Sequence, residues 1–259
     1  MKINLSFSAL QFDELQLREK NVIVVDVLRA STTVIVALSN GAREIIPVAS
    51  IESAVKISGS LFGEVTLRGG ERNGKIIEGF NLGNSPREYT ESTVRGKSII
   101  FCTTNGSVAM AKSRYAKNMA VGSFVNVAKV VDFVKQIDAD FWIVCAGKPM
   151  GLGSFSMEDA VCAGMMIEKI QKSEPAKIEL SDSSRAAQAL FKAHGKSILK
   201  MMKSSDHGQY LKSIGFEEDI ALCAGVDTHP FLPVLSGNVI KLRKDEQRSF
   251  EADVAAAGR

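Results

Sequence analysis

Short apolar runs alternate with helix-like segments along most of the chain. The run VIVVDV at residues 22–27 is rich in β-branched side chains, which is typical of a strand buried in a sheet. Similar runs predict strands at residues 43–49, 63–69, 97–103, 119–123 and 140–147. The segments between them predict helices near residues 51–62, 86–93, 106–116 and 127–137. This alternation indicates an α/β fold, with a largely parallel sheet sandwiched by helices in three layers.

The segment after the first of these strands allows two interpretations. Ser31 or Thr32 as N-cap, with Gly41 as C-cap, predicts a short helix over the residues TVIVAL. The β-branched side chains of this segment would equally allow a strand, because they restrict the helical rotamers. Both interpretations stay open on the sequence alone.

The pattern changes after Gly153. Longer helices are expected at residues 157–172, 183–203 and then over SDHGQYLKSIGF and EEDIALCAG, and HPFLPVL and NVIKLR predict two closing strands. We therefore expect one α/β domain over residues 1–259. Its parts are an alternating core at 1–153, a helix-rich C-terminal elaboration with closing strands at 154–245, and a terminal tail at 246–259.

Two features of the C-terminal part suggest further roles. The helical segment 175–225 could form a lid, with flexible points at Gly195, Gly208 and Gly215. The apolar residues of HPFLPVL could be exposed and support a homo-oligomer.

Composition narrows the class of protein. The chain has 259 residues, 32 Lys and Arg against 29 Asp and Glu, and 45% hydrophobic residues, which are ordinary values for a globular protein with a sizeable core. A net charge of +3 spread along the chain argues against a nucleic-acid partner. The four cysteines form no CxxC pair and are expected to be reduced, buried thiols. Without a signal sequence or an apolar run of about 20 residues, we expect a cytoplasmic protein with no membrane partner.

Polar side chains follow several predicted strands, at the point where each strand ends. In a parallel sheet these ends meet at one edge, where ligands bind. The residues concerned are Asp26, Arg29, Thr32, Thr33, Glu71, Arg72, Thr103, Thr104, Asn105, Gly106, Lys148, Ser154, Glu158 and Asp159, together with Asn84 and Ser85 at a predicted helix start. Backbone N–H groups at helix starts, with Arg and Lys side chains, favour phosphate or another anion.

The acidic residues of this set each have a structural alternative. Asp26 directly follows a buried strand, so its carboxylate should be paired or metal-bound, and an ion pair with Arg29 is the alternative to a functional role. Asp159 stands where it could cap a helix that starts after Ser156, which leaves Glu158 freer to face a ligand. Ser85-Pro86-Arg87-Glu88 fits a capping box as well as an anion site.

Carboxylate oxygens at such an edge suit Mg²⁺, which takes one or two carboxylates together with water and substrate oxygens. Mg²⁺ with arginines is the charge neutralisation that a phosphatase needs. Other familiar sites are excluded. The GKS triplets at 96–98 and 195–197 lack the first glycine of a P-loop, and neither Cys102 nor Cys145 has the arginine of a cysteine phosphatase six positions later.

Four strings occur together in colinear order. They are VDVLRASTTVIVALSNGA, GGERNG with GFNLGNSPRE, CTTNGS, and CAGKPMGLGSFSMEDAVCAG. Over residues 20–240 the chain resembles the 2-phosphosulfolactate phosphatase family. The resemblance implies Mg²⁺-dependent hydrolysis of (R)-2-phospho-3-sulfolactate to 3-sulfolactate and phosphate, a place in coenzyme M biosynthesis, and activity toward other phosphorylated 2-hydroxy acids.

We assign roles on chemical grounds. Asp26, Arg29, Arg72 and Glu158 are expected to be catalytic, and Asp26, Glu158 and Asp159 to hold Mg²⁺. The expected contacts of the small anionic substrate are Thr32, Thr33, Glu71, Asn84, Ser85, Thr103, Thr104, Asn105, Gly106, Lys148 and Ser154. Either water attacks the phosphorus in line, or Asp26 attacks it and forms an acyl phosphate. A non-catalytic sensor of a phosphorylated or sulfonated metabolite and a bare scaffold are the alternatives to an enzyme.

Overall fold

The computed structural model describes residues 1–60, 66–147, 155–173, 177–243 and 246. Within these residues eleven strands form one sheet, in the order β5-β4-β6-β3-β11-β10-β7-β2-β8-β1-β9. The strands are β1 (Lys2–Ser6), β2 (Asn21–Val25), β3 (Glu44–Pro47), β4 (Thr66–Arg72), β5 (Lys75–Ile76), β6 (Ser98–Cys102), β7 (Asn118–Gly122), β8 (Phe141–Cys145), β9 (Glu179–Leu180), β10 (Pro233–Ser236) and β11 (Val239–Leu242). The tail predicted at 246–259 lies, apart from residue 246, outside the described residues.

Two parallel groups of strands make up most of the sheet. In one group β4, β6 and β3 are parallel, and in the other β7, β2, β8, β1 and β9 are parallel. The antiparallel hairpin β10–β11 lies between the two groups and pairs with β7 and β3. The predicted closing strands are therefore confirmed, and they join the two groups in the middle of the sheet.

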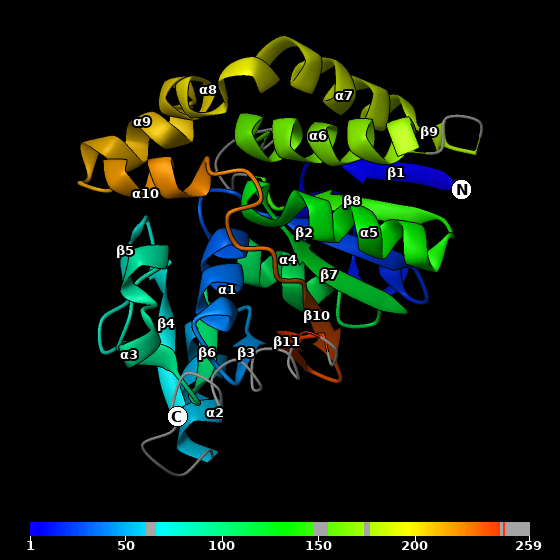
Figure 1. Ribbon diagram of the computed structural model, residues 1–259. Coiled ribbons are helices and arrows are strands. Elements are labelled where there is room, and N and C mark those ends of the chain that lie inside the picture. The colour runs from blue at the N-terminus through cyan, green and yellow to red at the C-terminus, as the bar shows by residue number, and fades with distance from the viewer. Residues whose placement is uncertain (61–65, 148–154, 174–176, 244–245, 247–259) are drawn as a thin grey trace, which may run out of the picture.

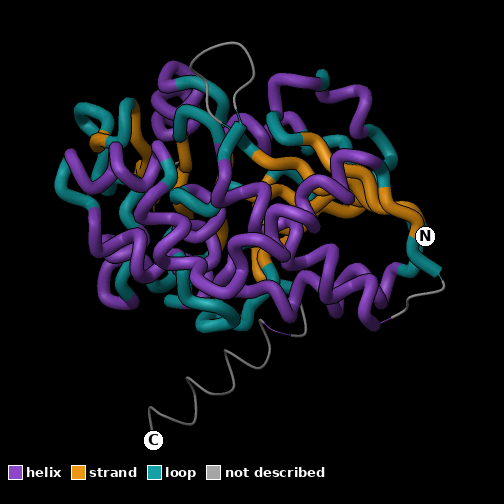
Figure 2. Tube along the Cα trace, turned by 90° about the horizontal axis from the view of Figure 1, so that it is seen from above, coloured by secondary structure: helices purple, strands orange, loops and turns teal. Residues whose placement is uncertain are grey.

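Helices cover both faces of the sheet (Figures 1 and 2). They are α1 (Ala30–Ser39), α2 (Ile51–Ser60), α3 (Glu91–Val94), α4 (Gly106–Lys112), α5 (Val127–Ile137), α6 (Met157–Ser173), α7 (Asp182–His194), α8 (Ile198–Ser204), α9 (Asp206–Ser213) and α10 (Glu217–Cys223). The side chains of β2 alternate between two apolar clusters. Ile23 and Val25 belong to the cluster that contains α5 and α6, and Val22 and Val24 to the one that contains α1 and α4. The predicted three-layer α/β fold is confirmed.

Several boundaries differ from the predictions. The segment after β2 is the helix α1, but its N-cap is Arg29 and makes no side-chain capping bond; the predicted caps Ser31 and Thr32 lie inside the helix. Residues 86–93 form a 3-10 turn and the short helix α3, and a 3-10 turn at Gly195–Ser197 divides the predicted helix 183–203 into α7 and α8. The strands β1, β5 and β9 were not predicted.

The helices α6 to α10 form a layer along the top of the molecule in Figure 1, and α9 and α10 face the strands β4 and β5. The predicted exposed segment HPFLPVL is not an open apolar surface, because Leu232 and Pro233 are buried and β10 pairs with strands on both sides. All four cysteines are buried and free, as predicted. In the described part of the chain, no helix has the length and apolar character needed to cross a bilayer.

Candidate active site

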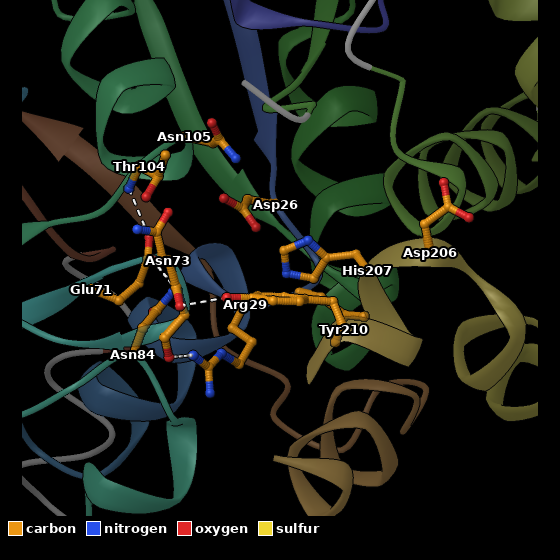
Figure 3. A pocket seen from close by; sticks show the side chains of 12 residues that line it. Asp26, Arg29, Glu71, Asn73, Asn84, Thr104, Asn105, Asp206, His207 and Tyr210 are labelled. Atoms are coloured by element: carbon orange, nitrogen blue, oxygen red, sulfur yellow. Dashed lines mark hydrogen bonds between the residues drawn. The ribbon is translucent and has the colours of Figure 1, made fainter. Parts of the chain in front are cut away.

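A cavity of about 260 Å³ lies beyond the carboxyl ends of β2, β4 and β6 (Figure 3). Parallel strands deliver their following loops to the same edge of the sheet, so residues distant in sequence meet there. Six of the predicted site residues line this cavity: Asp26, Arg29, Glu71, Asn84, Thr104 and Asn105. The structure thus brings these six predicted residues together around one cavity.

Asp26 follows β2 directly and is buried. Its backbone N–H donates to Ser31 Oγ at 2.9 Å, and its Oδ1 accepts from the Ala30 N–H at 3.3 Å. A Cβ on Gly106 would lie 2.4 Å from its Oδ2, so the close approach of α4 requires glycine at that position. Burial, with the charges of Glu71 and Glu158 nearby, raises the pKa of Asp26 from 3.8 to about 7.

Glu71 ties two loops of the site together. Its Oε1 accepts from the Thr104 N–H at 2.7 Å, and its Oε2 accepts from the Gly74 N–H at 2.8 Å. The carboxylate therefore fixes the β4–β5 turn against the loop between β6 and α4. Two backbone N–H groups stabilise its negative charge within this wall of the cavity.

Glu158 and Asp159 open α6 and lie close enough to Asp26 for their charges to interact. Asp159 accepts from the Val27 N–H at 2.8 Å and from the Gly147 N–H at 3.3 Å, so both of its oxygens have partners. Burial, followed by the charges of Asp26 and Glu158, raises its pKa well above the ordinary value. The Ser156 hydroxyl, rather than Asp159, accepts a capping bond at this helix start.

Arg29 is paired with Asp219 of α10, not with Asp26. Its Nη1 lies 2.7 Å from Asp219 Oδ2, its Nη2 donates to the Gly74 carbonyl at 2.8 Å, and its guanidinium stacks on the Phe216 ring at 4.2 Å. The other Asp219 oxygen accepts from Ser85 Oγ at 2.7 Å. The structure therefore rules out the structural alternative of an Asp26–Arg29 ion pair, because Arg29 pairs with Asp219. It also shows no capping bond from the Ser85 side chain, whose hydroxyl donates to Asp219 instead.

Other predicted residues support the walls without lining the cavity. The Thr32 hydroxyl bonds to the Val27 carbonyl and to Ser123, and the Thr33 hydroxyl donates to the Asn84 carbonyl at 2.9 Å. Thr103 Oγ1 accepts from the Ser107 N–H in the first turn of α4. In each case a backbone or hydroxyl partner already satisfies the side chain, so these threonines position the loops around the cavity.

Arg72 also lies apart from the cavity lining. Its guanidinium donates to the Glu71 carbonyl at 2.8 Å and to Cys102 Sγ at 3.2 Å. The predicted catalytic role of Arg72 requires it to lie in the cavity with Asp26. The structure does not place it there. Lys148 and Ser154 lie outside the described residues.

Three buried polar atoms have no hydrogen-bond partner among the described residues. They are Asn84 Oδ1, Thr104 Oγ1 and Glu158 Oε2. Buried polar atoms are hydrogen-bonded in the great majority of cases, so a cluster of exceptions at one edge of a sheet indicates a ligand. Asn84 and Thr104 both line the cavity, while Glu158 lies beside Asp26.

Asp26 and Glu158 are the two carboxylates that could hold a Mg²⁺ ion. Among the described residues, no group of three or more His, Cys, Asp or Glu side chains is arranged around one point as a metal site. Mg²⁺ needs only one or two carboxylates. Asp26, with its raised pKa, and Glu158, with its unpartnered oxygen, would both be stabilised by a cation, whereas the oxygens of Asp159 already accept backbone N–H groups.

Six residues that line the cavity are absent from the predicted site: Leu28 after β2, Asn73 and Gly74 in the β4–β5 turn, and Asp206, His207 and Tyr210 of α9. The segment predicted as a lid therefore supplies a wall of the site. The only signal in the sequence was the polar string DHGQY at the start of a helix. Gly195 and Gly208 are closely packed, because a Cβ on Gly195 would lie 2.4 Å from the Phe191 ring and a Cβ on Gly208 would lie 1.8 Å from the Met202 carbonyl oxygen.

Comparison with known proteins identifies the family. A sequence model described as 2-phosphosulpholactate phosphatase matches residues 9–238. The chain belongs to this family. It is 38% identical over 229 residues to the probable 2-phosphosulfolactate phosphatase of Caldanaerobacter subterraneus subsp. tengcongensis, which covers 88% of this chain and 93% of the relative. The protein of the same name from Clostridium novyi is 36% identical over 233 residues, covering 90% of this chain and 96% of the relative.

Membership of the 2-phosphosulfolactate phosphatase family makes this chain a phosphoric monoester hydrolase. The family resemblance drawn from the four sequence strings is confirmed. The sensor and the bare scaffold, which the sequence left as alternatives, are not supported. A cavity lined by two residues with unpartnered buried polar atoms, Asn84 and Thr104, also differs from what a scaffold with satisfied helix caps would show.

The buried ion pair between Arg29 and Asp219 yields a test of stability. Asp219→Ala leaves a buried guanidinium without its partner and should lower the free energy of unfolding by about 3–5 kcal/mol. Glu218→Ala is the matched control on the same helix, because Glu218 pairs with Arg87 at the exposed surface, and it should cost less than about 1 kcal/mol. Urea unfolding of both variants measures the difference; equal losses would contradict the assigned role of Asp219.

Asp26 yields a test of pH dependence. Because the pKa of Asp26 is raised to about 7, the folded protein holds a proton that the unfolded chain releases near pH 4. This residue therefore lowers stability progressively as the pH rises from about 4 to 7. Asp26→Asn keeps an oxygen for the Ala30 N–H but removes the charge. In EDTA it should raise stability by roughly 2–4 kcal/mol at pH 8 and by much less at pH 5.

Thermal unfolding at the two pH values measures this difference. Asp132→Asn, at an exposed position of α5, is the control and should leave the melting temperature unchanged at both. A gain in melting temperature in the Asp26 variant that is the same at pH 5 and pH 8 would contradict the raised pKa of the Asp26 carboxyl group.

Proposed function

We propose that the protein hydrolyses the phosphate ester of (R)-2-phospho-3-sulfolactate to 3-sulfolactate and phosphate, and that the reaction requires Mg²⁺. The observation that carries the proposal is the group of buried carboxylates at the end of β2, of which Asp26 faces the cavity and Glu158 has an unpartnered oxygen. The family membership supports the substrate, and the chemistry of the carboxylates supports the metal.

The charge of the cavity supports the need for a cation. The substrate carries a phosphate, a carboxylate and a sulfonate group. The described residues that line the cavity include three carboxylates, Asp26, Glu71 and Asp206, whereas the Arg29 guanidinium is already paired with Asp219. A polyanion would be repelled by this lining at close range. A divalent cation held by Asp26 and Glu158 would reverse that repulsion and supply charge neutralisation for the phosphoryl oxygens.

The chain's own polar groups would hold and orient the substrate. Thr104 Oγ1 can donate a hydrogen bond to an anionic oxygen because no described residue accepts one from it. The side-chain amides of Asn84 and Asn105 line the same cavity and can donate as well. Arg29, fixed by Asp219 and by the Gly74 carbonyl, would present a positive charge at a constant position.

The attacking oxygen stays open between the two routes stated for the sequence. Water attacks the phosphorus directly, or Asp26 attacks it and forms an acyl phosphate that water then cleaves. A single turnover in ¹⁸O-labelled water separates them, because label enters Asp26 only in the second route. Activity toward other phosphorylated 2-hydroxy acids, a place in coenzyme M biosynthesis and a cytoplasmic location stay predictions.

Phosphate release tests the proposed function. The purified protein should release phosphate from (R)-2-phospho-3-sulfolactate with Mg²⁺, and excess EDTA should abolish the release. Glu158→Gln removes one charge from the proposed metal pair and should lower kcat/KM by at least about 100-fold. Glu168→Gln, on the same helix but paired with Lys172 and Lys192 away from the cavity, is the control and should keep full activity.

The outcomes distinguish the parts of the proposal. Release that survives EDTA would overturn the requirement for Mg²⁺ and leave the substrate. No release with or without the metal would overturn the substrate.

A further inference from the structure

His207 is the one imidazole among the described residues that line the cavity. It lies near the start of α9, and Figure 3 shows its ring pointing into the cavity toward Asp26. The neighbouring Asp206 carboxylate points away from Asp26 in the same view. The ring therefore approaches the carboxylates of the β2 edge from the opposite wall of the site.

The start of α9 is firmly held. The Ser205 side chain caps the helix by accepting from the Gly208 N–H at 3.1 Å. A Cβ on Gly208 would lie 1.8 Å from the Met202 carbonyl, so α8 and α9 are in backbone contact beside His207. Leu211, one turn further on, is fully buried in the core. This anchoring fixes the backbone from which the imidazole projects.

Tyr210 holds α9 against the other side of the cavity. Its hydroxyl donates to the Asn73 carbonyl at 2.8 Å, across to the β4–β5 turn. Its ring packs edge-on against the His207 ring, with the centroids 6.3 Å apart. The same turn is held by Glu71 and Arg29 through Gly74. The wall that carries His207 is therefore tied to the wall that carries the carboxylates.

The proposed reaction needs a proton donor, and none of the residues assigned above supplies one. When the P–O bond breaks, its electron pair stays on the C2 oxygen of the substrate, and an alkoxide is a poor leaving group without a proton. Asp26 and Glu158 are assigned to the metal, the Arg29 guanidinium does not release its proton, and the Tyr210 hydroxyl is engaged with Asn73. An imidazole is the side chain best suited to give and regain a proton near neutral pH.

We propose that His207 is a catalytic residue that donates a proton to the bridging oxygen of the substrate as the P–O bond breaks. The inference rests on the function proposed above. The protonated imidazole gives its proton to the departing oxygen, which leaves as the alcohol of the 2-hydroxy acid. If water is the attacking group, its protons stay with the product phosphate, and solvent reprotonates the imidazole. If Asp26 attacks, the imidazole regains its proton from the water that cleaves the acyl phosphate.

Substitution of His207 tests this role. His207→Gln keeps a polar side chain of similar length but has no transferable proton. Its kcat should fall by about 100-fold to 10,000-fold while KM stays within about 3-fold, because proton transfer affects the transition state and not substrate binding. In His207→Ala, added imidazole should restore part of the lost kcat. His194→Gln, at the end of α7 and outside this cavity, is the control and should keep the wild-type kcat and KM.

The possible results separate this inference from the proposed function. An unchanged kcat in His207→Gln, or a raised KM with an unchanged kcat, would overturn the proton-donor role while the hydrolase activity of the unmodified protein stands. A loss of kcat that imidazole does not restore in His207→Ala would also overturn it, in favour of a structural role. Absence of turnover by the unmodified protein would overturn the proposed substrate and the inference together.

Discussion

Repulsion between buried carboxylates is the constraint on which this site depends. Asp26, at the end of β2, interacts through its charge with Glu71 of β4 and with Glu158 and Asp159 of α6, and burial adds a desolvation cost to that repulsion. The backbone N–H groups that reach Glu71 and Asp159 offset part of the cost for those two residues. The carboxylates of Asp26 and Glu158 accept fewer hydrogen bonds that would stabilise their negative charge, and a bound cation is the simplest way to stabilise it.

The fold brings these charges together and holds them apart from solvent. The β10–β11 hairpin joins the two parallel groups of strands into one sheet. The cavity is lined by residues at the carboxyl ends of β2 in one group and of β4 and β6 in the other. Arg29 then connects the end of β2 to α10 through Asp219 and to the β4–β5 turn through Gly74. The buried ion pair between Arg29 and Asp219 thus joins two walls of the cavity that are 190 residues apart in the sequence.

Local patterns were enough to predict eight of the eleven strands in the described residues, without β1, β5 and β9, and the residues at the ends of several of them. Asp26 and Thr104 could be placed at one edge because each directly follows an apolar strand, and parallel strands share an edge. The partners of those residues could not be predicted in this way. Asp219 pairs with Arg29 because α10 packs over the site. His207 lies at the cavity because α9 packs on α8. Such contacts depend on tertiary packing, which leaves no periodic signal in the sequence.

Calorimetric titration of Mg²⁺ at pH 7, in two buffers with different ionisation enthalpies, tests the central claim most directly. Because burial and the nearby charges of Glu71 and Glu158 raise the pKa of Asp26 to about 7, a fraction of the molecules carry its proton at this pH, and metal binding should release protons. Asp26→Asn should release fewer. Binding with proton release in the unmodified protein is the predicted result. Absence of binding, or binding with no release of protons, would contradict the view that the buried carboxylates form a cation site.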